Sequence, residues 1–96
     1  MPCYLCKYIP PRADFLETMT DEEQELMRRH GDFLDRLLEE GLIVAHGPVM
    51  DPSGGYGVSL YRIADGELIE TLTAQDPIVK TGCGRYEHYP MLHLKS

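Results

Sequence analysis

The sequence lacks tryptophan, has only two phenylalanines, and contains no apolar run near the roughly 20 residues that span a bilayer. We therefore expect no membrane segment. The first residues, from Met1 to Lys7, also lack the charged start and the longer apolar stretch of a secretory signal. These absences predict a cytoplasmic protein.

Basic residues are also scarce, since nine lysines and arginines stand against 16 aspartates and glutamates, for a net charge of −7. A field of this sign repels polyanions over long distances. Nucleic acid is therefore not an expected partner.

The three cysteines do not form a recognisable metal or disulfide pattern. Cys3 and Cys6 are three residues apart in a predicted strand, where odd spacing directs side chains to opposite faces. This geometry disfavours a shared zinc ion and a disulfide, so free buried thiols in a reducing compartment are expected. Arg85 lies two residues after Cys83, which leaves a redox role open there.

The last predicted strand carries two histidines, His88 and His93. Their odd spacing also places them on opposite faces, which argues against a metal-binding pair. We expect neither a metal nor a cofactor.

Residue periodicity and turn chemistry predict four strands and two main helices. The helix signal that begins with Thr20-Asp21-Glu22-Glu23 has the form of a capping box, and apolar residues follow at three- and four-residue steps up to Gly41. Asp76-Pro77 has the form of a second helix cap. In chain order we expect a strand over 3–9, a connector over 14–19, a helix over 20–40, strands over 42–46 and 56–63, a helix over 66–75 with a further turn to 80, and a strand over 86–94.

This β-α-β-β-α-β order is that of the α+β ferredoxin-like fold, with a four-stranded antiparallel sheet and two helices on one face. We expect a single domain over residues 1–96. The predicted strands are apolar on both sides, and the first is aromatic on one side with Leu5 and Ile9 on the other. A sheet with water on its uncovered face alternates more cleanly, so we expect a homodimer packed sheet face to sheet face.

Several short motifs follow one another along the chain: His30 before Phe33-Leu34, Gly47-Pro48, the glycine-rich loop near Gly54, Asp76-Pro77 and Gly82. Together they resemble the YCII-related family of dimeric α/β-barrel proteins over nearly the whole chain. The resemblance implies a ferredoxin-like protomer, a dimer with facing sheets, and an active site built from His30 and Asp76. Most members have no assigned reaction, although the family is similar to, and includes, 5-chloromuconolactone dehalogenase.

A pair formed by His30 and Asp76 would be suited to proton transfer, because histidine exchanges protons near neutrality and a carboxylate fixes its tautomer. The predicted topology brings the start of the first helix and the end of the second to one edge of the sheet. His30, however, lies about 14 Å along its helix at 1.5 Å per residue. Structural roles also stay open, since such a histidine is commonly a core residue and an aspartate before proline is commonly a helix cap.

Four further residues fall on loops or strand ends near the same predicted edge: Arg12, His46, Tyr56 and Arg85. The fork of an arginine suits a carboxylate, so we expect these residues to bind a small anionic or lactone-like molecule. The alternative for each arginine is an ion pair with one of the many surface acids.

Two functions therefore stay open from the sequence. The first is a cofactor-independent lyase, isomerase or dehalogenase-type enzyme, in which His30 moves a proton beside a carbonyl group and Asp76 orients the imidazole. The second is a non-catalytic homodimer that binds a metabolite or serves as an interaction module. A contact between the two side chains beside a cavity would favour the first.

Overall fold

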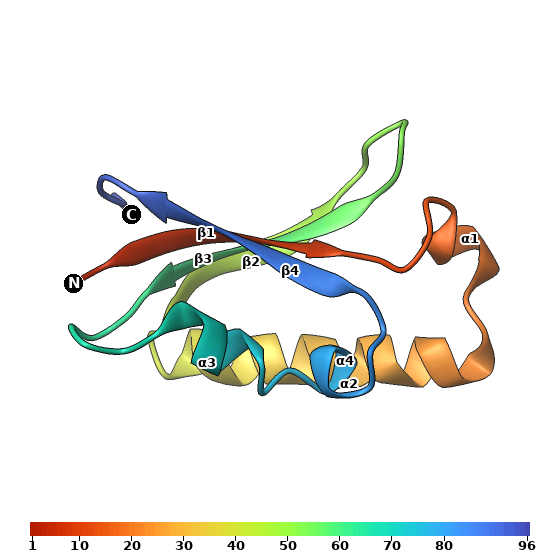
Figure 1. Ribbon diagram of the computed structural model, residues 1–96, viewed down its shortest axis with the longest axis horizontal. Coiled ribbons are helices and arrows are strands. Elements are labelled where there is room, and N and C mark those ends of the chain that lie inside the picture. Colours follow the sequence, from red (N-terminus) through yellow and green to blue (C-terminus); the bar gives the residue numbers. More distant parts are fainter.

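The computed structural model describes residues 1–96 as four strands and four helices. The expected β-α-β-β-α-β order is present, with one additional short helix and with the second helical segment divided in two (Figure 1). In chain order the elements are β1 (Cys3–Ile9), α1 (Phe15–Thr18), α2 (Asp21–Glu39), β2 (Ile43–Val49), β3 (Tyr56–Arg62), α3 (Ile69–Thr73), α4 (Pro77–Lys80) and β4 (Arg85–Met91).

The strands form one antiparallel sheet in the order β2-β3-β1-β4. Helices α2, α3 and α4 lie against one face of this sheet, whereas α1 lies beyond the end of β1 (Figure 1). The arrangement confirms the predicted ferredoxin-like α+β fold. The opposite face of the sheet carries no helix.

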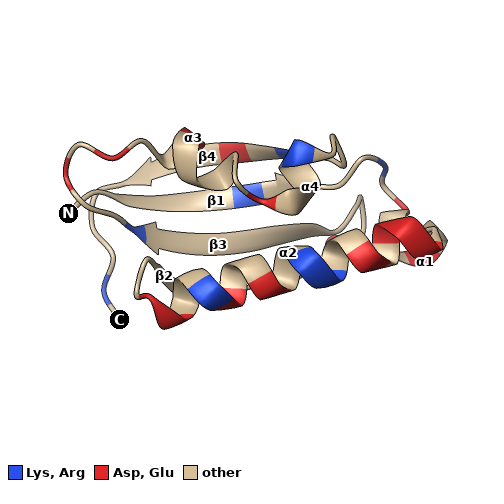
Figure 2. Ribbon diagram, turned by 90° about the horizontal axis from the view of Figure 1, so that it is seen from below, with Lys and Arg blue, Asp and Glu red and all other residues tan.

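Helix α2 begins at the predicted capping box. The Thr20 hydroxyl accepts a hydrogen bond from the Glu23 N–H at 3.1 Å, and the Glu23 carboxylate accepts one from the Thr20 N–H at 2.9 Å. Charged residues of both signs follow the exposed side of α2 (Figure 2). The buried side chains of α2 are His30, Phe33, Leu34 and Leu37. No helix is both long enough and apolar enough to cross a membrane.

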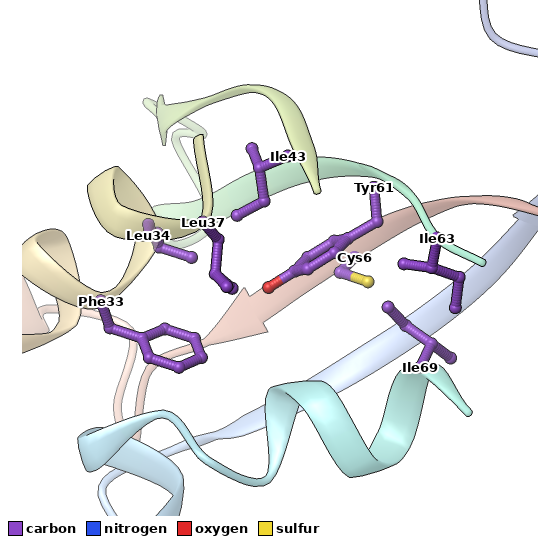
Figure 3. Packing of buried hydrophobic residues seen from close by; sticks show 8 residues of the cluster. All are labelled: Cys6, Phe33, Leu34, Leu37, Ile43, Tyr61, Ile63 and Ile69. Carbon is purple, nitrogen blue, oxygen red and sulfur yellow. The ribbon is translucent and has the colours of Figure 1, made fainter. Parts of the chain in front are cut away.

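The main core lies between the sheet, the second half of α2 and α3 (Figure 3). It contains eight buried residues: Cys6, Phe33, Leu34, Leu37, Ile43, Tyr61, Ile63 and Ile69. Burial of each large apolar side chain contributes roughly 1.5–3 kcal/mol. The Tyr61 hydroxyl points toward Leu37 and Phe33 and has no hydrogen-bond partner (Figure 3). Burial raises the pKa of this hydroxyl, so it stays neutral within the core.

Two boundaries in the first half of the chain differ from the prediction. The expected connector over 14–19 contains α1, whose four residues are too few to show a helical period in the sequence. Strand β2 does not stop at Gly47-Pro48 but continues to Val49. It is an edge strand paired only with β3, so a proline without an N–H is tolerated there.

The strands that follow also differ at their ends. Strand β3 stops at Arg62, and β4 runs from Arg85 to Met91 instead of to residue 94. Leu92 is fully exposed, so no burial holds the chain in the sheet beyond Met91. His93 therefore lies outside the strand on which we expected it.

The helix-free face of the sheet carries an apolar row. Leu60, Leu5 and Tyr89 are direct partners across β3, β1 and β4, so their side chains share one face. Leu5 and Leu60 are half-buried and Tyr89 is exposed. This face is apolar at its centre and is not covered within the protomer.

Candidate active site

Asp76 is placed by the start of α4. Pro77 occupies the first turn, and Asp76 Oδ1 accepts a hydrogen bond from the Ile78 N–H at 3.1 Å, as the cap motif in the sequence predicts. The Asp76 side chain is fully buried. A buried carboxylate needs protein donors in place of water, so its remaining partners decide what it can do.

His30 is the main partner of this carboxylate. Its Nδ1 lies 2.6 Å from Asp76 Oδ2, because α4 packs directly against α2 and closes the distance along the helix (Figure 1). An ionised carboxylate only accepts hydrogen bonds, so we assign the proton to Nδ1. The lone pair then lies on Nε2, which makes no hydrogen bond to the protein.

Tyr86 on β4 is a third member of the group that the sequence did not reveal. Its hydroxyl donates to Asp76 Oδ2 at 2.8 Å. Burial raises the pKa of Tyr86, and the negative charge of Asp76 raises it further, so Tyr86 stays a neutral donor. The Tyr8 ring packs beside both, with centroids 5.2 Å from His30 and 5.8 Å from Tyr86. These contacts hold the imidazole in one orientation.

His30 lines a cavity of about 240 Å³ between α2, α1 and the sheet. No lysine or arginine lines it. Four glycines line it. A Cβ at Gly31 would meet nothing within 4 Å, and one at Gly57 would meet only the Tyr8 side chain, at 3.5 Å. Pockets for drug-sized ligands measure roughly 300–1,000 Å³, so this cavity suits a molecule with a single ring.

Two of the four further candidates border the same cavity, His46 and Tyr56. His46 Nε2 lies 2.9 Å from Asp35 Oδ1, which joins β2 to α2. The Tyr56 ring carries the Lys7 ammonium 4.3 Å from its centroid. His46 therefore closes one end of the cavity, while the Tyr56 ring already has a cationic neighbour.

The two arginines do not line the cavity. Arg12 donates to both Glu23 carboxylate oxygens at 2.9 and 2.7 Å, and these hydrogen bonds lower the pKa of Glu23 to about 2. Arg85 is largely exposed and pairs with Glu87 at 2.8 Å. The structure thus brings His30 and His46 to one cavity, with Asp76 buried behind His30, and it places both guanidinium groups against surface acids.

The remaining reactive groups are the possible metal ligands and the three thiols. No three histidine, cysteine, aspartate or glutamate side chains gather closely enough to hold a metal ion. Cys3, Cys6 and Cys83 are free and buried. Burial raises the pKa of Cys6 to about 12, and the charge of Glu70 adds to this rise, so this thiol does not ionise near neutrality.

The sequence matches the family model of the YCII-related domain over residues 3–95. A comparison with curated protein sequences gives no match.

Two solved structures share the fold. One is the 5-chloro-2-hydroxyhydroquinone dehydrochlorinase TftG from Burkholderia phenoliruptrix AC1100, in complex with 2,5-dihydroxybenzoquinone. It is 13% identical with a TM-score of 0.64, and the match covers 97% of this chain and 95% of that chain. The other is a variant of SnoaB, a cofactor-independent oxygenase from Streptomyces nogalater, 13% identical with a TM-score of 0.51, covering 99% and 94%. At such identities the likeness concerns the fold, which resembles that of dimeric α/β-barrel proteins.

Proposed function

This chain belongs to the YCII-related family, and from that premise we propose that it is a cofactor-independent enzyme of the lyase, isomerase or dehalogenase type. It moves a proton on a small ring-shaped metabolite. The observation that carries this proposal is the 2.6 Å contact between His30 Nδ1 and Asp76 Oδ2 beside a cavity. Family membership also suggests a homodimer.

His30 acts as the general base in this scheme. Its Nε2 takes a proton from a carbon next to a carbonyl group, or from a phenolic hydroxyl. Asp76 accepts the Nδ1 proton, fixes the tautomer and stabilises the imidazolium that forms. The Tyr86 hydroxyl and the Ile78 N–H hold the carboxylate in place. Proton transfer by a positioned side chain accelerates reactions by about 10²–10⁴-fold.

The cavity narrows the substrate class. Its lining has no lysine or arginine, so a strongly anionic molecule would enter without a counter-charge. Since Arg12 and Arg85 lie outside, we favour a lactone-like or phenolic ring over a dicarboxylate. The ligand bound to TftG, 2,5-dihydroxybenzoquinone, is a suitable first probe because it is a single ring that carries both hydroxyl and carbonyl groups.

Proton exchange tests the proposal directly. The protein is incubated in deuterated buffer with a panel of butenolide lactones and hydroxylated quinones, and loss of carbon-bound protons is followed by NMR. We expect exchange with the natural sequence, a strong loss in His30→Gln and Asp76→Asn, and no change in His93→Gln, a control at an exposed histidine. Equal exchange in His30→Gln would contradict the assigned role.

A second candidate function is a non-catalytic metabolite-binding or interaction module. The observation in its favour is that the same contact ties α2 to the N-terminus of α4. If this were its purpose, His30→Gln would lower the melting temperature but leave ligand binding unchanged, and no substrate would exchange protons.

We further propose that two copies pair through the helix-free faces of their sheets. Leu60, Leu5 and Tyr89 form the apolar row on this face, and sheets pack face to face at about 10 Å. In analytical ultracentrifugation we expect a dimer for the natural sequence and a monomer for Leu60→Lys. Leu38→Lys, at an exposed leucine on α2, is the matched control and should stay dimeric. A monomeric natural protein would disprove the pairing.

A further inference from the structure

Ser59 on β3 is a buried polar residue that the scheme above does not use. It is 2% exposed and lines the cavity. Its hydroxyl lies near that of Tyr61, whose pKa it lowers against the larger effect of burial, but no hydrogen bond of normal length joins the two. The Tyr61 hydroxyl is the only sealed side-chain polar atom without a partner, so Ser59 Oγ is open to the cavity. A buried hydroxyl is unfavourable unless a partner satisfies it, and a molecule in the cavity would be a better partner than the long contact with Tyr61.

The sheet register places Ser59 on the face of the sheet that the helices cover. Gly57 pairs with Tyr8, which is buried beneath the helices, so Ser59, two residues farther along β3, points to the same side. Ser59 is also the direct partner of His46 on β2. Ser59 on the sheet and His30 on α2 both line the cavity, and Gly57 adds no side chain to its wall.

Three other polar side chains near this space already have partners. The Tyr8 hydroxyl donates to the Cys83 carbonyl oxygen at 2.8 Å, and the Tyr86 hydroxyl donates to Asp76. His46 Nε2 contacts Asp35. Among the buried residues that line the cavity, the Ser59 hydroxyl is therefore the O–H group that can serve a bound molecule.

We propose that Ser59 donates a hydrogen bond to the carbonyl or phenolic oxygen of the substrate and stabilises it as it becomes negative. This inference rests on the proposed function and adds a specificity: the substrate must place an oxygen at Ser59 while its acidic proton faces His30. The C–H bond breaks, its electron pair forms the carbon–carbon double bond of an enolate, and the carbonyl pair moves to oxygen. The proton stays on His30 Nε2, so no other reactant is needed.

Two variants of nearly equal shape test the contribution of the Ser59 hydroxyl alone. Ser59→Thr and Ser59→Val both add bulk to the same position and differ only by an O–H against a methyl group. We expect proton exchange in Ser59→Val to be about 10- to 100-fold slower than in Ser59→Thr. Since the hydroxyl makes no hydrogen bond of normal length to the protein, Ser59→Ala should melt at the same temperature as the natural protein or slightly higher. A structural role would instead lower the melting temperature of Ser59→Ala.

Binding of p-nitrophenol tests the hydroxyl without relying on turnover, because its absorbance distinguishes the phenol from the phenolate. We expect the bound probe to ionise at lower pH in the natural protein than in Ser59→Ala, with about 10-fold tighter phenolate binding. If Ser59→Ala behaves like the natural protein while His30→Gln loses exchange, the inference fails and the proposed function stands. If no protein exchanges protons but Ser59→Ala still loses phenolate binding, the inference stands and the proposed function fails. Absence of probe binding to the natural protein would also overturn the inference.

Discussion

Two histidine–aspartate contacts link α2 to the rest of the molecule, one in the interior and one at the surface. His30 Nδ1 lies 2.6 Å from Asp76 Oδ2, with side chains 9% and 0% exposed. His46 Nε2 lies 2.9 Å from Asp35 Oδ1, with side chains 19% and 64% exposed. The Asp76 carboxylate also accepts from a tyrosine hydroxyl and a backbone N–H, whereas Asp35 makes no second hydrogen bond.

The difference between the two contacts shows what burial adds to the same pair of groups. Water competes for an exposed carboxylate, so a surface pair contributes about 0–1 kcal/mol. In the interior no water replaces a lost donor, and each partner becomes necessary to the others. Only the interior pair can therefore hold one histidine tautomer firmly enough for proton transfer.

The largest expected effect is the difference in stability lost when each of the two carboxylates is removed. Asp76→Ala removes the acceptor for three buried donors and should lower the free energy of unfolding by about 3–5 kcal/mol. Asp35→Ala should cost less than about 1 kcal/mol. Urea unfolding followed by circular dichroism measures both. Similar losses in the two variants would mean that burial does not distinguish the contacts.

The next effect compares the histidines by activity. His30→Gln removes the base and should slow proton exchange by about 10²–10⁴-fold. His46→Gln alters one end of the cavity but leaves Nε2 of His30 free, so we expect a loss below about 10-fold from weaker substrate positioning. Exchange rates at saturating substrate provide the measurement. A greater loss of exchange rate in His46→Gln than in His30→Gln would indicate that His46, and not His30, is the base.

A smaller effect concerns Tyr86, the third member of the buried group. Tyr86→Phe removes one donor to Asp76 and should cost about 1.5–3 kcal/mol at neutral pH. Burial, followed by the charge of Asp76, raises the pKa of Tyr86, so its contribution is present below the unfolded value of about 10 and is lost as pH rises beyond it.

The stability of Tyr86→Phe should therefore fall less steeply above about pH 10 than that of the natural protein. Buried Tyr8 and Tyr61, whose pKa values are also raised by burial, supply the remaining dependence. Tyr56→Phe, whose hydroxyl makes no hydrogen bond, serves as the control. Parallel alkaline stability curves for Tyr86→Phe and the natural protein would argue against a buried donor.

The smallest expected effect is the dependence on salt of the stability that the surface pair contributes. The contribution of the surface pair, measured as the difference between the natural protein and His46→Gln, should be below about 1 kcal/mol and should vanish in about 1 M salt, where the screening length is near 3 Å. The loss caused by Asp76→Ala should persist under the same conditions. A salt-sensitive loss at Asp76 would indicate that water reaches this carboxylate.

Local signals predicted much of the fold. The strand over Cys3–Ile9 has the predicted bounds, and the helix starts at Thr20 and Asp76 carry the predicted caps. These features depend on neighbouring residues only. Helix α1 escaped prediction because one turn leaves no period, and the length of β2 depends on its place at the sheet edge, which is a property of the whole sheet.

The candidate site was less accessible to sequence reasoning. His30 and Asp76 were identified singly, but their contact depends on how the segment before α4 folds back along α2. Arg12 sits in a surface ion pair, the alternative that its many acidic neighbours suggested. Tyr86 and Ser59 left a weak signal, a hydroxyl at an inward position of an otherwise apolar or aromatic strand face, which gains meaning only once the register is known.

The N-cap role of Asp76 has a consequence for evolution in the laboratory. The same carboxylate starts α4 and orients His30, so a random library selected only for folded protein would retain it whether or not turnover was demanded. Ser59 could change to other small residues in that library and would become fixed as serine only when turnover was selected. Retention of Asp76 would thus report selection for the fold, and retention of Ser59 would report selection for the reaction.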